Sequence, residues 1–170
     1  AGTGNTKALY LDLTNAQGGD FAGAWNNTTP NATTFTVGTS NETNRNGSNF
    51  IAYCWAEIEG FSKFGSYEGN NNADGPFIYC GFKPAWIMFK GIDSVTNWVI
   101  VDSSRDSVNS AYNDILFPDA NVAANTGANK YLDFVSNGFK LRGTSGAVNA
   151  AETYVFMAFA ESPFQNANAK

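Results

Sequence analysis

Two glutamates, Glu57 and Glu59, have the spacing that comes closest to a catalytic arrangement. Two residues apart at the end of a strand, their carboxylates would point to the same face of a sheet. Glycosidases use such a pair as acid and base on a glycosidic bond. In an internal repeat described below, Glu57 matches Glu161, whose own neighbour two residues on is Pro163, so half of the pair is missing there. We therefore expect Glu57 and Glu59 to end a strand or bind backbone amides.

The absence of histidine from the sequence narrows the chemistry further. A Ser-His-Asp triad, a Cys-His pair and the usual zinc sites all need this residue. Most hydrolase mechanisms are thereby excluded, and we expect the protein not to be an enzyme.

An asparagine-rich loop is the candidate metal site. Asn70, Asn72 and Asp74 place side-chain oxygens at alternating positions, as calcium loops do. The full acidic series and the distal bidentate glutamate of such loops are missing, and Asn-rich turns show the same pattern without a metal. We expect no required cofactor, with Ca²⁺ as the metal that these three residues could bind.

A second polar loop carries the candidate ligand-binding residues Trp25, Asn26 and Asn27. An exposed aromatic ring beside amide side chains is a common way to hold a sugar ring. The other interpretation is that Trp25 anchors the loop over the end of a sandwich.

Cys54 and Cys80 lie in apolar, strand-like runs without a neighbouring His or second Cys. A disulfide between them is one interpretation, and two buried free thiols is the one we favour.

Composition indicates which elements position these residues. The 22 Asn and 17 Gly, with many Thr, are typical of turns and exposed strand faces rather than helix interiors. The net charge of −5 argues against binding to nucleic acid or to an anionic membrane surface. No run of about 18 apolar residues could span a bilayer, so we expect no membrane insertion.

Short apolar or alternating runs recur along the chain, separated by Gly, Asn, Pro and Ser clusters, which predicts strands of a sandwich or barrel. The predicted strands are residues 7–13, 33–37, 49–58, 76–80, 85–89, 97–101, 131–135, 138–141 and 153–160. The run 49–57 has apolar residues on both faces, which predicts a central strand. Asn137-Gly138 predicts a tight type I′ hairpin, since both residues accept positive φ.

The sequence also contains an internal repeat, in which residues 35–37 match 139–141 and residues 50–57 match 154–161, both 104 residues apart. The repeat predicts that residues 1–64 are the C-terminal half of a first unit, whose front half would lie on preceding polypeptide. Residues 65–164 would then be a second, complete unit packed against it, and residues 165–170 a tail.

Several stretches of this sequence resemble the C-terminal repeats of tailed-bacteriophage virion structural proteins, and the likeness covers residues 7–164. The stretches that carry it are residues 51–67, 73–77, 81–89, 97–98, 136–142 and 154–164. The resemblance implies tandem antiparallel β-sandwiches of the jelly-roll or concanavalin-like, lectin-like kind. It implies no catalytic residues.

The resemblance and the repeat together lead to an expected function. We expect a virion protein of a tail fibre, tail spike or capsid decoration that forms homo-oligomers and contacts other virion proteins on the particle surface. The alternative is a receptor-recognition module that binds host-surface glycan.

Overall fold

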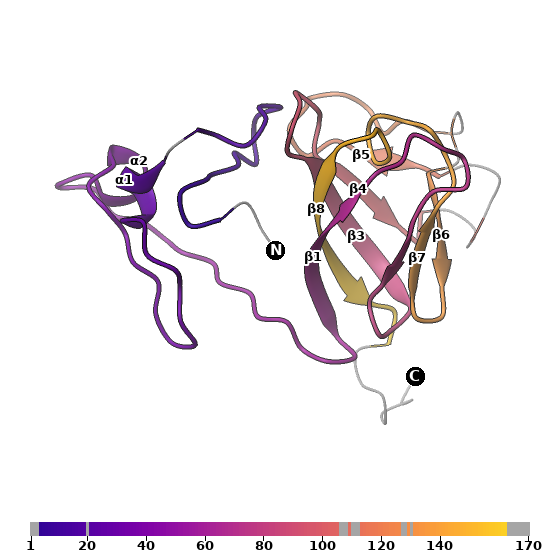
Figure 1. Cartoon of the computed structure of the whole chain (residues 1–170), viewed down its shortest axis with the longest axis horizontal. Coiled ribbons are helices and arrows are strands. Elements are labelled where there is room, and N and C mark those ends of the chain that lie inside the picture. Colours follow the sequence, from indigo (N-terminus) through magenta and orange to yellow (C-terminus); the bar gives the residue numbers. More distant parts are fainter. Residues whose placement is uncertain are drawn as a thin grey trace.

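The regular secondary structure of the protein is almost entirely β-strand (Figure 1). The computed structural model describes residues 4–19, 21–105, 109, 113–126, 129 and 131–162. The described residues form strands β1 (Ser62–Glu68), β2 (Phe77–Tyr79), β3 (Pro84–Gly91), β4 (Val99–Asp102), β5 (Ile115–Leu116), β6 (Leu132–Val135), β7 (Gly138–Leu141) and β8 (Thr153–Ala160), with two one-turn helices α1 (Ala22–Trp25) and α2 (Asn41–Asn44).

The strands form two antiparallel sheets that share one core, so the predicted all-β antiparallel sandwich is confirmed. One sheet has the order β1-β8-β3-β4-β5 and the other has the order β2-β7-β6. Strand β1 is an edge of the first sheet, and β2 is an edge of the second. Six predicted strands, from 76–80 to 153–160, correspond to β2, β3, β4, β6, β7 and β8 and are confirmed.

Strand β8 lies between β1 and β3 and shows why the alternating pattern works here. Tyr154, Phe156 and Ala158 are buried against the core, whereas Val155 and Met157 lie on the outer face and are partly exposed. The period of two therefore matches a strand with one face in the core.

Aromatic side chains from both sheets form the centre of the core. Phe139 of β7 is fully buried, and its ring centroid lies 5.5 Å from that of Phe89 and 5.4 Å from that of Phe156. Tyr67 of β1 lies 6.2 Å from the same ring. All three of these pairs are edge-on, an arrangement that the ring quadrupoles favour.

The predicted hairpin between β6 and β7 is confirmed, but its predicted turn conformation is wrong. Val135 pairs with Gly138, so Ser136 and Asn137 form the loop, and neither Asn137 nor Gly138 has positive φ. Gly138 is needed for a different reason: a Cβ there would lie 2.0 Å from the backbone oxygen of Ile78 in β2.

The first three predicted strands, residues 7–13, 33–37 and 49–58, are not strands in the structure. Residues 49–57 are exposed rather than central, with Ile51 81%, Tyr53 74% and Trp55 62% exposed. Alternation predicts that a segment can be a strand, but a strand also needs a neighbour to bond its backbone. Among the described residues these segments have no neighbouring strand, apart from the isolated bridge at Ile58.

The internal repeat is not visible as two similar units. The predicted boundary at residues 64–65 falls inside β1, and both sheets are formed by residues 62–160. Residues 35–37 and 50–57 do not adopt the strand conformation of their counterparts in β7 and β8. Pro163, Phe164 and the predicted tail lie outside the described residues.

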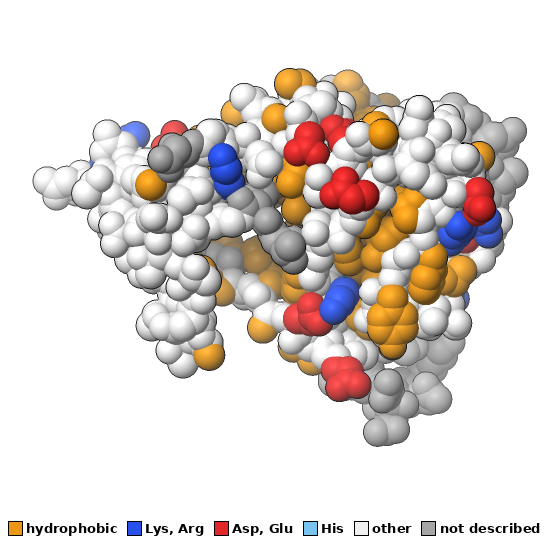
Figure 2. Space-filling model, viewed as in Figure 1, with side chains coloured by type: hydrophobic (Ala, Val, Ile, Leu, Met, Phe, Trp, Pro, Cys, Tyr) orange, Lys and Arg blue, Asp and Glu red, His pale blue; other side chains and the backbone are white. Residues whose placement is uncertain are grey.

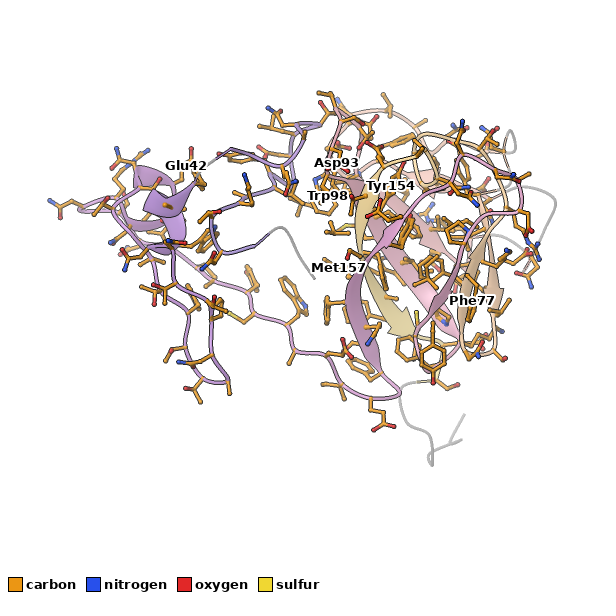
Figure 3. All side chains as sticks on the ribbon, in the orientation of Figure 1. Glu42, Phe77, Asp93, Trp98, Tyr154 and Met157 are labelled. Carbon is orange, nitrogen blue, oxygen red and sulfur yellow. The ribbon has the colours of Figure 1, made fainter. Side chains whose placement is uncertain are left out.

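Residues 10–17, which we call the N-terminal segment, are hydrogen-bonded to one end of the larger sheet (Figure 3). The Trp98 indole donates a hydrogen bond to the Tyr10 carbonyl over 2.8 Å, and Gln17 N donates to the Ile92 carbonyl over 2.9 Å. The buried Lys90 ammonium reaches the carbonyls of Thr14 and Thr96. Residues 21–48, which we call the N-terminal lobe, follow this segment and lie beside the sandwich (Figure 1).

None of the helices in the described part of the chain has the length and apolar character that a bilayer span requires.

Candidate functional site

An open cleft separates the edges of the two sheets. It has a volume of about 410 Å³ and lies between β1 and β2, with Phe156 of β8 also lining it. Gly65 contributes no side chain to this wall, and a Cβ there would lie 2.9 Å from the Phe156 ring. Phe77 and Tyr79 of β2 are 47% and 63% exposed beside it. Figure 2 shows hydrophobic side chains gathered on this face of the molecule.

The edge of β1 that borders this cleft has unpaired backbone groups. Phe61 O accepts from Ala160 N at the end of β8, and Gly69 N donates to the carbonyl of Glu152, just before β8 begins. Ser62, in contrast, directs both its N–H and its carbonyl away from β8, toward Ile58. In an antiparallel ladder the direction alternates along the strand. The N–H and carbonyl groups of Phe64, Ser66 and Glu68 therefore point to the open edge, where no described strand pairs with them.

A hydrogen-bonded turn at residues 58–62 leads into β1. Ile58 and Ser62 exchange two backbone hydrogen bonds, and Phe61 N donates to the Ile58 carbonyl over 3.0 Å. Gly60 has φ +74°, as the third residue of a type II turn requires. The signal in the sequence was Gly60, but β1 itself was not predicted because its polar and glycine residues break the apolar pattern.

The turn also determines where Glu57 and Glu59 lie. Glu57 forms an ion pair with Lys63 over 2.6 Å, and this contact raises the pKa of Lys63. Glu59 lies inside the turn and is exposed. The expectation that Glu57 and Glu59 share one face of a strand is therefore wrong, because the chain reverses between residues 58 and 62.

Upstream of the turn, residues 50–57 form an extended segment with its apolar side chains in solvent, including Ile51, Tyr53 and Trp55. The rings of Tyr53 and Trp55 lie 6.3 Å apart on the same face. The segment connects the N-terminal lobe to the start of β1 (Figure 1). A row of exposed aromatic and aliphatic residues of this length is uncommon on a protein that has no partner for it.

Trp25, Asn26 and Asn27 lie together at the end of α1. The indole of Trp25 donates a hydrogen bond to the Lys7 carbonyl over 3.1 Å and is half-buried, an arrangement that resembles the loop anchor more than a free stacking surface. Asn26 and Asn27 are exposed and both have positive φ, which asparagine tolerates better than most residues. Sugar binding by these residues stays a prediction.

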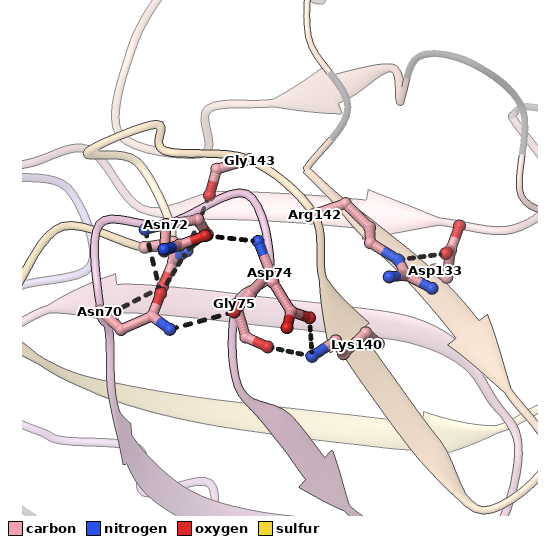
Figure 4. Close-up of polar contacts among 9 residues, drawn as sticks. Asn70, Asn72, Asp74, Gly75, Asp133, Lys140, Arg142 and Gly143 are labelled. Carbon is pink, nitrogen blue, oxygen red and sulfur yellow. Dashed lines mark hydrogen bonds and ion pairs between the residues drawn. The ribbon is translucent and has the colours of Figure 1, made fainter.

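The side-chain oxygens of Asn70, Asn72 and Asp74 are engaged within the protein (Figure 4). Asn70 Oδ1 accepts from Asn72 N over 3.0 Å, and Asn72 Oδ1 accepts from Asp74 N over 2.8 Å. The Lys140 ammonium lies 2.7 Å from an Asp74 oxygen and lowers the pKa of that carboxyl.

The buried side chain of Asn149 is hydrogen-bonded to this loop: it accepts from Asn70 N and donates to the Asn72 carbonyl. A cation, that of Lys140, already lies against the loop's one carboxylate. No group of three or more His, Cys, Asp or Glu side chains with metal-site geometry occurs among the described residues. Ca²⁺ binding by Asn70, Asn72 and Asp74 stays a prediction.

The two cysteines are both free, but the expectation that both are buried is wrong for Cys54, which is exposed. Burial raises the pKa of the Cys80 thiol to about 12. Since the thiolate is the reactive form, we expect iodoacetamide at pH 8 to modify Cys54 in the native protein and to leave Cys80 intact. Peptide mass spectrometry measures both sites, and rapid modification of Cys80 without denaturant would contradict the core position of this residue.

A family model described as a domain of unknown function, DUF7483, covers residues 1–163. No curated protein and no solved structure matches the chain.

Proposed function

The chain belongs to the DUF7483 family, a domain of unknown function, and we propose that it is a non-catalytic virion structural protein that self-assembles on the particle surface. The observation that carries this proposal is the exposed apolar segment 50–57 beside the unpaired edge of β1. An open edge and an exposed strand-like segment are the two halves of a strand-pairing contact. Both are surfaces through which copies of one protein associate.

The likeness of the sequence to phage virion proteins supports the particle as the place of action. A low content of charged residues, 15% of the chain, also favours close contact between copies because few charges need to be desolvated. Tail fibre, tail spike and capsid decoration are the three positions that this proposal covers.

The first test is the mass of the protein in solution. We expect light scattering after size exclusion to give a mass for the natural chain that rises with protein concentration from 18.2 kDa to a multiple of it. A variant with Ile51→Ser, Tyr53→Ser and Trp55→Ser should be monomeric, because these residues supply the apolar surface. A control with Val95→Ser and Val122→Ser, which are 73% and 64% exposed, should keep the natural mass. A natural chain that stays at monomer mass up to millimolar concentration would disprove self-assembly.

The second test is electron cryo-microscopy of purified particles labelled with an antibody to the chain. Label on a head or tail is the expected result, and its position distinguishes decoration from fibre. Label on a cell surface or on free filaments would overturn the virion assignment.

A further inference from the structure

We propose that residues 51–57 form a closing strand, which adds to the open edge of β1 in the same chain and places Tyr53 and Trp55 in the cleft between β1 and β2. In the structure this segment extends away from the edge, toward the N-terminal lobe (Figure 1). The cleft and the edge together form an acceptor site for one extended strand with aromatic residues at alternate positions.

The register of the closing strand follows from the turn that is already formed. Ile58 pairs with Ser62, and the next opposed pair, Glu57 and Lys63, is joined by an ion pair of 2.6 Å. The Ser62 hydroxyl additionally donates to the Ala56 carbonyl over 3.0 Å. The first contacts of an antiparallel hairpin are therefore present, and the chain leaves the edge just beyond them.

Extending this register puts the large side chains on the side of the cleft. Trp55 would lie opposite Gly65, and Tyr53 opposite Tyr67. Gly65 pairs with Phe156 and Tyr67 pairs with Tyr154, so this is the face of β1 that is directed to the core. Residues opposite each other in an antiparallel pair share a face, so Tyr53 and Trp55 would enter the cleft.

The space and the backbone of the edge fit this occupant. A volume of about 410 Å³ lies in the range that holds a drug-sized molecule, so it accommodates two aromatic side chains. The small residues Ala52, Cys54 and Ala56 would lie on the opposite face of the added strand. Their backbone groups would meet those of Glu68, Ser66 and Phe64 respectively, which point to the open edge.

The same chain is the source of the strand because the connection is short. With three residues between Ile58 and Ser62, the effective concentration of the strand at the edge far exceeds that of another copy. Closure would bring Ala52 beside Glu68, which pairs with Thr153. Ile92 bonds to Thr153, and Gln17 bonds to Ile92, so both ends of the N-terminal lobe would meet at one end of the sheet.

Closure would also control association, and this part of the inference rests on the proposed function. The open form exposes both the segment and the edge of β1, whereas the closed form covers each with the other. We therefore expect the closed chain to be monomeric and the open chain to assemble.

The test uses Cys54, which is exposed, and a second cysteine introduced by Ser66→Cys in the opposed position. Opposed residues in a hydrogen-bonded antiparallel pair have Cα atoms about 5.5 Å apart, within the range of a disulfide. With oxidised glutathione we expect an intrachain Cys54–Cys disulfide at least about tenfold faster than in the control Val95→Cys, whose site is exposed but lies in the connection between β3 and β4, strands that β8 separates from β1. The oxidised chain should be monomeric, and reduction should restore assembly.

Each other outcome has a definite meaning. A disulfide between chains, or one no faster than in the control, would overturn closure in the same chain. An intrachain disulfide with unchanged assembly would overturn the control of association while the proposed function stands. A reduced protein that never assembles would instead disprove the proposed function, and the disulfide rate would still decide closure.

A measurement on the natural chain removes dependence on the variant's folding. Hydrogen exchange should show the amides of Phe64, Ser66 and Glu68 protected at low concentration, where association is absent. Tyr53→Ser with Trp55→Ser should abolish this protection, and Val95→Ser should not. Fast exchange of all three amides in the natural chain would contradict the closing strand.

Discussion

Replacing Phe139 by alanine is expected to lower the free energy of unfolding by about 3–5 kcal/mol, the cost typical of removing a buried phenylalanine ring. Phe139 is fully buried, and its ring packs against those of Tyr67, Phe89 and Phe156, all from the opposite sheet. The substitution would leave a cavity between the two sheets. Urea unfolding followed by near-UV circular dichroism should show the midpoint falling by roughly 1–3 M.

The repeat supplies the matched control. Phe35 is the sequence counterpart of Phe139 but is 44% exposed and lies outside both sheets. Phe35→Ala should change the unfolding free energy by no more than about 0.5 kcal/mol. Equal losses for the two variants would mean that the N-terminal region contains a core of its own, as the repeat predicts.

The second large effect is expected for Lys90→Met, which should cost about 2–4 kcal/mol because it leaves buried carbonyl groups without a donor. The Lys90 side chain is fully buried, and its ammonium lies 3.2 Å from Thr14 O, 3.0 Å from Gly91 O and 2.9 Å from Thr96 O. Desolvation lowers the pKa of this ammonium, against the opposing influence of Asp119 and Glu152.

Lys90→Met should have a local signature as well as a global one. The variant should speed hydrogen exchange of Gln17 and Thr96, whose amides join the N-terminal segment to the sheet. Lys83→Met is the control, since Lys83 makes a surface ion pair with Glu161 and such pairs contribute at most about 1 kcal/mol. Similar unfolding free energies for both variants would show that the Lys90 contacts do not hold the segment.

Six of the seven strands after residue 76 were predictable because each is an apolar or alternating run with a neighbour that the chain itself supplies, whereas β5, with two residues, was not predicted. Strand β8 is the clearest case, with Tyr154, Phe156 and Ala158 in the core and with β1 and β3 on its two sides. Strand β1 was not predicted because Ser62, Gly65 and Ser66 interrupt the alternation of apolar and polar residues. It is a strand because its partner β8 is strongly specified.

The candidate site was predictable in its parts but not in its arrangement. The polar loops at Trp25 and at Asn70 were visible in the sequence, but the contacts that fix them to the rest of the protein come from Lys7, Lys140 and Asn149, which are distant along the chain. The cleft between β1 and β2 has no sequence signal at all, since it exists only where the edges of two sheets come together.

Residues 50–57 show the difference between what the sequence determines and what the tertiary structure determines. The sequence by itself determined that this segment can be a strand, through its alternation and its match to β8. Tertiary structure decided that it stands exposed beside an open edge, because a strand is stable only when another strand bonds its backbone and covers its apolar face. Alternation is a property of a few neighbouring residues, whereas pairing depends on which distant residues the fold brings alongside.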